Sequence, residues 1–363
     1  MKCKLEDIVD VTMGQSPKSE YYNTEGKGYP FLQGNRTFGF KYPTFDTYTT
    51  VMTKPANAGD VIMSVRAPVG DLNITPVDMC LGRGVCSLRM KNGNQDFLFY
   101  MMKYYIPHLL KKESGTVFGS VNRNDINGLE VDIPEDAQVQ KKIARYLEMI
   151  DDKIELNNTI NNNLEQQAEA LYKEYFAPVY TEMQNIKTLD MFCNIFTGKK
   201  NSNASTPDGK FKFFTCSPEP LQIDSFIFDG NAIIVSGNGA YTGRTRFYSG
   251  KFDLYQRTYA CTLKEGFNSD YIFPLYWFVK LELSKKIMGG TRGSAIPYIV
   301  MNDLAKFEFE FDQNKFESYM PLFKSITETI QANENQNETL AQLRDGLLPR
   351  LMSGELDVSD IEL

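Results

Sequence analysis

The residues able to carry out covalent or metal chemistry are few in this sequence, and they are spread apart. Histidine occurs once, as His108, in a chain of 363 residues. Six cysteines occur without any C-x-x-C pair, so neither a zinc site nor a redox-active dithiol is predicted. A nucleophilic triad built on histidine is equally unsupported. We therefore expect no catalytic residue, no bound metal and no cofactor, with reduced and mostly packed thiols at Cys3, Cys80, Cys86, Cys193, Cys216 and Cys261.

Signatures for phosphate binding are also missing. A nucleoside-triphosphate loop needs Gly-Lys followed by Ser or Thr, and each Gly-Lys pair here is followed by another residue. The stretch GNGAYTG (237–243) resembles a glycine-rich nucleotide loop, but its spacing is not G-x-G-x-x-G. Tight turns between strands explain it better. These observations argue against an NTPase.

Length and composition limit the architecture. A chain of 363 residues with 42% apolar residues suits two or three globular domains. No stretch approaches the roughly 20 consecutive apolar residues that a membrane helix needs, and MKCKLEDIVD lacks the apolar core of a signal peptide. We expect a cytoplasmic protein with no membrane partner.

The elements that must position any functional residues become visible when the sequence is compared with itself. Two segments, 176 residues apart, carry apolar residues at heptad spacing, and six of ten positions are identical, including two asparagines. Arg344, which takes the place of Ala168 in the second copy, is the residue whose type is least suited to an apolar seam. The first seam is Ile143, Leu147, Ile150, Ile154, Asn157, Asn161, Leu164, Ala168, Leu171 and Tyr175, and the second is Tyr319, Phe323, Ile326, Ile330, Asn333, Asn337, Leu340, Arg344, Leu347 and Leu351.

The segments upstream of both seams also correspond. SGTVFGSVNRNDINGLEV (114–131) parallels GGTRGSAIPYIVMNDLAKFEF (289–309), and GDVIMSVRAPVG (59–70) parallels GNAIIVSGNGAYTG (230–243). The aromatic stretches 97–105 and 271–279 are interpreted as equivalent core helices rather than as surfaces for base stacking. The sequence therefore predicts an α+β tandem duplication with mixed domains at 1–137 and 178–314, long helices at 138–177 and 315–353, and a tail at 354–363.

Each long helix should cover about 39 residues, or about 58 Å at ~1.5 Å per residue. Heptad spacing favours a helical partner, and the other copy is the obvious one. Because Pro178 ends the first helix beside the second domain, the second helix has to run back, which predicts an antiparallel coiled coil with a pseudo-twofold axis. Asn157 would then face Asn337, and Asn161 would face Asn333.

A buried asparagine layer costs stability but fixes register, because any slip leaves amides unpaired. Asn157, Asn161, Asn333 and Asn337 are therefore our candidates for setting the helix register. The alternative is that these asparagines lie on a solvated face and that Ile160 belongs to the seam instead. Their recurrence in both copies favours the seam.

Two similar heads held apart by a twofold match the symmetry of double-stranded DNA, in which half-sites lie about one turn (~34 Å) or more apart. The chain resembles the specificity subunits of type I restriction-modification enzymes, in which two target-recognition domains alternate with two long helices. The motifs that carry this resemblance extend over almost the whole chain. They are VTMGQSP (11–17), GDVIMSVRAPVG, GSAIPYIVMNDL (293–304), LEQQAEALYKEYF (164–176) and TLAQLRDGLLPRLMSGEL (339–356).

The resemblance implies a non-catalytic role, and the [DN]-P-P-[YF] motif of a modification methyltransferase is absent. Each recognition domain would read one half of a bipartite double-stranded DNA target, with the helices setting the spacer. Two modification subunits that use S-adenosylmethionine would dock on the helices, and restriction subunits would add ATP-driven translocation and cleavage. A two-headed scaffold that binds protein rather than DNA is the alternative, and the acidic tail favours it mildly.

Candidate DNA-binding residues follow from side-chain type in the predicted loops. Base edges are read by Arg, Lys, Asn and Gln, while Ser, Thr and backbone groups hold phosphates. Each such residue is otherwise an ordinary solvated loop side chain. The first domain supplies Gln15, Ser16, Lys18, Gln33, Asn35, Arg36, Arg66, Thr116, Ser120, Asn122 and Arg123. The second supplies Lys199, Lys200, Asn201, Asn238, Arg244, Arg246, Thr291, Arg292, Ser294 and Tyr298.

A net charge of −7 is unfavourable for binding to the phosphates of DNA. Counted by segment, however, residues 1–137 carry −1, 138–176 carry −2, 177–311 carry +2 and 312–363 carry −6. The acidity is concentrated in the last helix and tail. Both heads are close to neutral, which predicts weak DNA affinity for the isolated chain.

Overall fold

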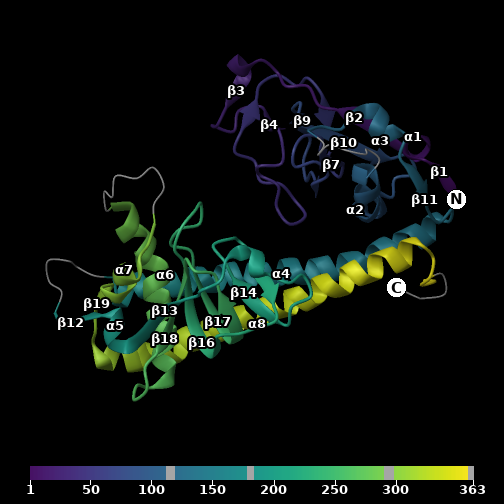
Figure 1. Ribbon diagram of the computed structural model, residues 1–363. Helices are drawn as coiled ribbons and strands as arrows, with labels where there is room; N and C mark the ends of the chain where they lie inside the picture. The colour runs from purple at the N-terminus through teal and green to yellow at the C-terminus, as the bar shows by residue number, and fades with distance from the viewer. Residues whose placement is uncertain (112–118, 178–183, 290–297, 359–363) are drawn as a thin grey trace. The chain divides into compact units, whose positions relative to one another are not determined.

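The computed structural model describes residues 1–111, 119–177, 184–289 and 298–358, and the chain forms two compact units. Unit 1 comprises residues 1–156 and 337–363, and unit 2 comprises residues 157–336. Each unit holds one mixed α/β head and half of each long helix. We call residues 1–136 head 1 and residues 184–312 head 2, and we describe each unit by itself (Figure 1).

The two long helices are α4 (Ala137–Tyr175, 39 residues) and α8 (Gln313–Met352, 40 residues). Equivalent aspartates begin them. Asp136 Oδ1 accepts the N–H of Gln138 (2.7 Å), and Asp312 Oδ1 accepts the N–H of Asn314 (2.9 Å). A side-chain acceptor at this place satisfies the free N–H groups of the first helical turn. The predicted pair of long helices is confirmed.

Head 1 contains two main sheets and three α-helices. A four-stranded antiparallel sheet has the order β2-β10-β7-β8, and a second sheet has the order β3-β5-β4-β9-β6. The elements are β1 (Lys2–Lys4), α1 (Leu5–Ile8), β2 (Val9–Met13), η1 (Ser19–Tyr21), β3 (Tyr22–Asn23), β4 (Tyr29–Leu32), β5 (Tyr48–Thr49), β6 (Pro55–Ala56), β7 (Val61–Ser64), β8 (Leu72–Ile74), β9 (Met79–Leu81), β10 (Val85–Met90), α2 (Gln95–Lys111), α3 (Arg123–Asn127) and β11 (Glu130–Asp132).

Head 2 follows the same order with fewer and longer strands. Its six-stranded sheet has the order β13-β18-β16-β17-β14-β15. The elements are β12 (Ile186–Thr188), α5 (Leu189–Phe192), β13 (Cys193–Thr197), η2 (Ser202–Ala204), β14 (Phe211–Phe214), β15 (Leu221–Ile223), β16 (Phe228–Ser236), β17 (Thr245–Leu254), β18 (Thr258–Leu263), η3 (Ser269–Tyr271), α6 (Ile272–Gly289), α7 (Met301–Ala305) and β19 (Glu308–Glu310).

The duplication predicted from the sequence has a matching strand order. In head 1, β10 lies between β2 and β7; in head 2, β18 lies between β13 and β16. A small two-stranded ladder closes each head, β1 with β11 and β12 with β19. The short helices α3 and α7 even begin alike, since Asp125 and Asp303 each accept the N–H of the residue three positions earlier at 2.9 Å.

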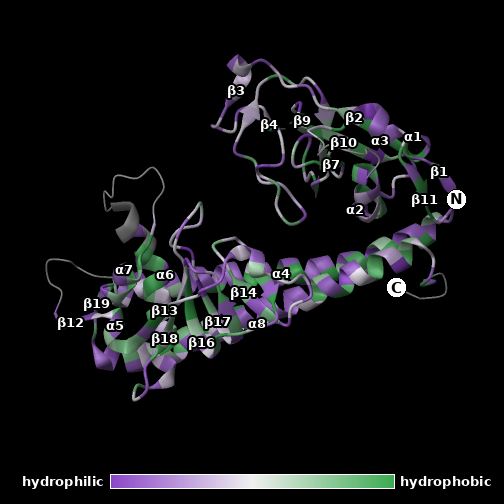
Figure 2. Ribbon diagram, viewed as in Figure 1, coloured by the Kyte–Doolittle hydropathy of each residue, from purple (hydrophilic) through white to green (hydrophobic). Residues whose placement is uncertain are grey.

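Each main core lies between one sheet of its head and one aromatic-rich helix, and the core helices predicted at residues 97–105 and 271–279 are found there. Helix α2 buries Phe97, Phe99 and Tyr100 in unit 1, and α6 buries Phe273, Trp277 and Phe278 in unit 2. Figure 2 shows hydrophobic residues along α6, whereas hydrophilic residues interrupt the apolar ones along α4 and α8. The long helices therefore bury only one stripe each.

The two long helices run antiparallel in each unit. In unit 1 the beginning of α4 packs with the end of α8, where Ile143, Leu147 and Leu351 share one core. In unit 2 the end of α4 packs with the beginning of α8, where the rings of Tyr175 and Tyr319 stack with their centroids 4.4 Å apart. The predicted antiparallel arrangement is confirmed.

Candidate nucleic-acid interface

Five loops meet at one edge of head 1, and we call this edge rim 1: residues 14–16, 33–34, 65–66, 82–84 and 120–121. The turn 82–84 between β9 and β10 connects them. The N–H of Gly82 donates to Leu32 O (2.7 Å), and the N–H of Val65 donates to Gly84 O (2.9 Å). The last loop joins through the N–H of Val121, which donates to Val65 O (2.9 Å).

Rim 1 brings together five residues that the sequence proposed separately. Ser16 Oγ accepts the N–H of Arg83 (3.1 Å), and Arg66 forms an isolated antiparallel bridge with Ser120. Gln15, Gln33, Arg66 and Ser120 are exposed. Polar side chains that share an edge and face solvent can meet the edges and phosphates of a nucleic acid.

Head 2 repeats the backbone connections of rim 1, and we call the corresponding edge rim 2: residues 198–201, 215–216, 237–238, 255–257 and 298–299. The N–H of Tyr255 donates to Phe214 O (3.0 Å), and the N–H of Gly237 donates to Arg257 O (2.9 Å). The N–H of Ile299 donates in turn to Gly237 O (2.8 Å). Gly82 and Gly84 therefore correspond to Tyr255 and Arg257.

The side chains on rim 2 differ from those on rim 1. Lys199 and Tyr298 are exposed, and Asn238 is half-buried. Asn201 Oδ1 accepts a hydrogen bond from Gln256 Nε2 (2.8 Å). Just beyond the rim, the Arg244 guanidinium lies over the Tyr241 ring, 4.1 Å from its centroid. The two rims therefore share a backbone frame and present different recognition groups.

Several predicted residues are engaged inside their own head. Lys200 Nζ pairs with the buried Asp253 carboxylate (2.7 Å) and also contacts Ser225. Arg246 donates to the carbonyls of Ser217 and Pro218, and burial lowers the pKa of its guanidinium. Both side chains therefore have hydrogen-bond or ion-pair partners within head 2.

In head 1 the same is true in part. Asn35 donates to Asp71 (2.5 Å), and Arg36 pairs with Asp46 (2.8 Å). Asn122 is the N-cap of α3, and Arg123 donates to Val11 O (2.7 Å). Lys18 lies 3.8 Å from Glu20. The predicted residues Thr116, Thr291, Arg292 and Ser294 lie outside the described residues.

Sequence reasoning missed the central turn of each rim. Arg83 and its counterpart Gln256 are both exposed, and Arg257 follows Gln256. In the sequence they lie in LGRGV and LYQRT, short polar turns directly before a buried strand. In head 1, the available signal was a polar residue with Gly on both sides between two apolar strands.

Three of the four seam asparagines, Asn157, Asn161 and Asn333, lie where α4 and α8 meet in unit 2. Asn157 is fully buried, and Asn161 is 9% exposed. Asn333 Nδ2 donates to Asn161 Oδ1 (2.7 Å), and Asn157 Nδ2 donates to Gln336 Oε1 (2.8 Å). Ile160 is only half-buried, and Asn333 is half-buried as well. Amides therefore bond across the two helices at this point of the apolar stripe.

A charged cluster attaches head 1 to the helices of unit 1. Asp151 of α4 is 1% exposed and accepts from Tyr100 Oη (2.9 Å) and from Arg344 Nη1 (2.7 Å). Lys103 Nζ lies 3.6 Å from the same carboxylate. The buried Asp151 carboxylate accounts for the presence of an arginine in the otherwise apolar seam, because it binds the Arg344 guanidinium. Burial, and then the Asp151 charge, raise the pKa of Tyr100 well above its ordinary value.

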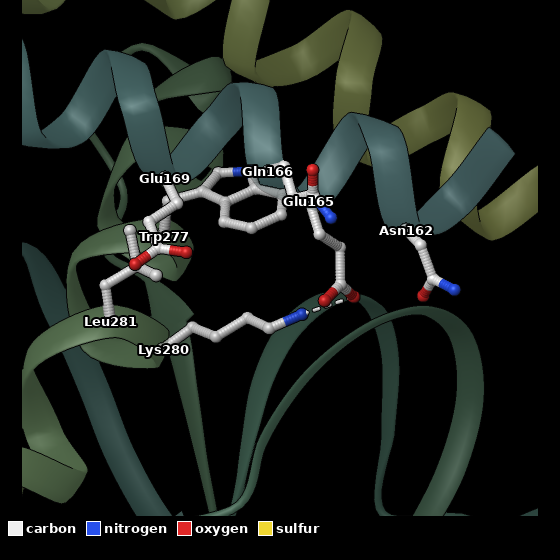
Figure 3. Close-up of a pocket in the computed structure, with 7 residues that line it drawn as sticks. All are labelled: Asn162, Glu165, Gln166, Glu169, Trp277, Lys280 and Leu281. Atoms are coloured by element: carbon white, nitrogen blue, oxygen red, sulfur yellow. Dashed lines mark hydrogen bonds and ion pairs between the residues drawn. The ribbon is translucent and has the colours of Figure 1, made fainter. Parts of the chain in front are cut away.

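At the equivalent place in unit 2 the aromatic side chain of the core helix has a neutral partner, and a partly exposed ion pair lies beside it. Trp277 Nε1 donates to Thr327 Oγ1 (2.9 Å), and Ala168 stands where unit 1 has Arg344. Figure 3 shows Lys280 of α6 reaching Glu165 of α4, at 2.6 Å. They line a small pocket with Asn162, Gln166, Glu169, Trp277 and Leu281.

Neither a metal-binding cluster nor a membrane-spanning helix is present among the described residues. Within the parts of the chain that the structure describes, His, Cys, Asp and Glu nowhere gather in threes around a possible metal position. The described helices include none with the length and apolarity to cross a membrane. Four of the predicted thiols, Cys80, Cys86, Cys193 and Cys261, are buried, and burial raises the pKa of Cys86 and of Cys193 to about 12.

Comparison with known families shows which family the chain belongs to. The model of the type I restriction modification DNA specificity domain matches residues 1–166 and 182–312. The match extends over well more than half of the sequence and includes both heads. The chain belongs to this family.

Individual relatives of the chain come from the same family. The chain is 38% identical over 163 residues to the putative type I restriction enzyme MjaX specificity subunit of Methanocaldococcus jannaschii. It is 32% identical over 180 residues to the type I restriction enzyme EcoDI specificity subunit of Escherichia coli. These matches include 44% and 47% of this chain, and the chain covers 38% of the length of each relative.

A solved structure resembles the whole chain. It is the crystal structure of a type I restriction-modification system S subunit from M. genitalium, with a TM-score of 0.63 and 15% sequence identity. The match covers 99% of this chain and 96% of that one. At this identity the likeness shows the fold, which is the predicted arrangement of two tandem mixed domains with long helices.

Proposed function

We propose that this chain is the non-catalytic subunit that chooses the DNA target of a type I restriction-modification complex. Each head reads one half of a bipartite double-stranded target. The observation that supports this proposal most directly is that rim 1 and rim 2 share one backbone frame but present different side chains. A shared frame positions two equivalent readers, while different side chains make each reader select different bases.

The chemistry of the rims fits this role. Rim 1 presents Gln15, Gln33 and Arg66 to solvent, and rim 2 presents Lys199 and the Gln256–Asn201 amide pair. Amide and guanidinium groups are the groups that pair with base edges in the major groove. Backbone hydrogen bonds tie these loops to one another and to the strand ends, so the backbone that carries the side chains is positioned before DNA arrives.

The long helices supply the remaining parts of the proposal. They would set the spacer between the half-sites, and the amide bonds around Asn157 and Asn161 would fix their register. Two modification subunits would dock on them and methylate adenine in each half-site with S-adenosylmethionine bound to those subunits. Restriction subunits would add ATP-driven cleavage, and this chain itself would need no cofactor.

The charge distribution predicts how affinity is shared within the complex. Because both heads are nearly neutral and residues 312–363 carry −6, the isolated chain should neutralise few phosphates. Its affinity for DNA should then depend less steeply on salt concentration than the affinity of the complex with modification subunits. Equal slopes for the chain alone and for the complex would contradict this part of the proposal.

The decisive experiment is a methylome. DNA from cells that express this chain with a cognate modification subunit is sequenced by a single-molecule method that detects methyladenine, and cells with the modification subunit alone serve as the control. We expect a split adenine-methylated motif only when the chain is present. If both proteins are soluble and associated but no motif appears, the chain is better described as a two-headed protein-binding scaffold.

A further inference from the structure

The turn between β9 and β10 is the centre of rim 1. Its three residues contact three different loops. Gly82 donates to Leu32 O at the end of β4, Arg83 donates its N–H to Ser16 Oγ, and Gly84 accepts from Val65 N. The backbone of Arg83 is therefore fixed from three directions, while its side chain is exposed.

The two glycines allow this close packing. A Cβ on Gly82 would lie 2.7 Å from the Cα of Gln33, and one on Gly84 would lie 2.1 Å from Gln33 O. Neither position can carry a side chain unless the Gln33 loop moves away. Gly-Arg-Gly thus places a single long side chain at the meeting point of the loops.

The guanidinium of Arg83 differs from those of its neighbours. Arg36 pairs with Asp46, Arg89 pairs with Asp60 (2.6 Å), and Arg123 donates to a carbonyl. Among the described residues, no carboxylate lies within ion-pair distance of Arg83. The rim residues near its turn are the neutral Gln15, Ser16 and Gln33. An exposed fork of N–H donors that has no acceptor among the described side chains is available to an external one.

We propose that Arg83 is a specificity-determining residue that reads a guanine in the half-site of head 1. This inference rests on the function proposed above and deepens it. A guanidinium on a fixed backbone can donate two parallel hydrogen bonds to O6 and N7 of guanine, the commonest specific contact in the major groove. A phosphate contact would use the same charge but would carry no base preference.

Head 2 offers a natural comparison at the same position. Gln256 takes the place of Arg83, and its amide is held by Asn201. A glutamine amide matches N6 and N7 of adenine rather than guanine. The two heads therefore differ at the central position of their rims in the way that two different half-sites require.

The test exchanges this one residue in the full chain. Arg83→Gln is expressed with the modification subunit, and the methylated motif is compared with that of the wild type. We expect one guanine of one half-site to lose its preference by about tenfold or more, while the other half-site stays unchanged. Lys2→Gln, which removes the same charge from exposed strand β1 of head 1, is the control and should leave the motif intact.

The outcomes separate the two proposals. If the wild type gives no split motif, the proposed function fails. If the wild type gives the motif and Arg83→Gln methylates the same motif, or methylates all its sites more slowly without any change of base, Arg83 does not read a base and the inference is overturned. Circular dichroism and co-purification with the modification subunit establish that the variant is folded, and Arg83→Lys, which keeps the charge, should also lose the guanine preference.

Discussion

Head 1 and head 2 attach to the same two helices through different chemistry. In unit 1, Tyr100 and Arg344 both bond to the buried carboxylate of Asp151, whereas in unit 2 the equivalent contact joins Trp277 to Thr327. A second contact is reversed in charge. Lys41 of head 1 pairs with Glu148 of α4 (3.1 Å), and Asp270 of head 2 pairs with Lys324 of α8 (2.9 Å).

The difference shows which part of the attachment the fold requires. Both units place an aromatic side chain of the core helix against the long helix, and both satisfy its polar atom with a hydrogen bond. Only unit 1 adds a fully buried carboxylate at this contact, because its seam carries Arg344 in place of a small residue, whereas the Lys280–Glu165 ion pair of unit 2 is partly exposed. A buried acid then becomes necessary, because an unpaired buried charge costs far more than a neutral contact.

The largest effect should come from Asp151→Ala, which leaves Arg344 and Lys103 without their shared partner. We expect unit 1 to lose about 3–5 kcal/mol of stability, the usual cost of breaking a buried ion pair from one side. Hydrogen exchange measured by mass spectrometry on α2 and α6 peptides separates the units. Exchange in α2 should accelerate strongly, and exchange in α6 should not.

The matched variant on the other unit is Thr327→Val. It removes the acceptor of the Trp277 N–H together with the hydroxyl that donates to Phe323 O within α8, and a loss of about 1–2 kcal/mol is expected in unit 2. If the two variants destabilise their units equally, the contrast between charged and neutral attachment has no energetic meaning.

An effect of similar size is expected where α4 and α8 bond through amides. Asn161→Leu removes the acceptor of Asn333 Nδ2 and should cost unit 2 about 1–3 kcal/mol. The double variant Asn161→Leu with Asn333→Leu removes both polar groups and should regain most of that loss. Thermal unfolding of the single and double variants measures both effects. A double variant as unstable as the sum of two single losses would show that the amides do not act as a pair.

Converting one attachment into the other should change stability still less. The substitutions Tyr100→Trp, Asp151→Thr, Arg344→Ala and Ala341→Glu give unit 1 the residues that unit 2 has at the same positions, Glu165 included. Because a buried charged group can be replaced by packed neutral residues at little cost, we expect stability within about 1.5 kcal/mol of the wild type. A loss as large as that of Asp151→Ala would mean that the surrounding packing, and not the charge pairing, distinguishes the units.

The repeated and periodic elements of the fold could be predicted from the sequence. Heptad spacing located α4 and α8, and the parallel motifs upstream of both helices indicated that the heads are copies, because both signals are repeats within the sequence. The partners of long polar side chains could not be predicted, since they come from distant segments. The Lys200–Asp253 and Arg344–Asp151 ion pairs form only after folding brings these segments together. Arg83 was missed because its importance lies in three backbone contacts that the sequence does not display.

The smallest expected effect separates the two equivalent lysines of the core helices. Burial lowers the pKa of Lys103 in spite of Asp151 nearby. Burial alone would lower the pKa of Lys280 as well, but Tyr276 and Glu165 outweigh it and raise that pKa above 10.5. Between the lowered pKa and 10.5 the unfolded chain binds more protons at Lys103 than the folded one, so this residue makes unit 1 more stable as pH rises. Lys280 acts in the opposite direction, and its contribution to unit 2 is lost as pH rises from 10.5 through the raised folded pKa. NMR titration of the lysine Cε signals, assigned with Lys103→Arg and Lys280→Arg, should show Lys103 losing its proton first. Titration in the reverse order would mean that Asp151 holds Lys103 as firmly as Glu165 holds Lys280, and the contrast between the two attachments would then rest on Arg344 alone.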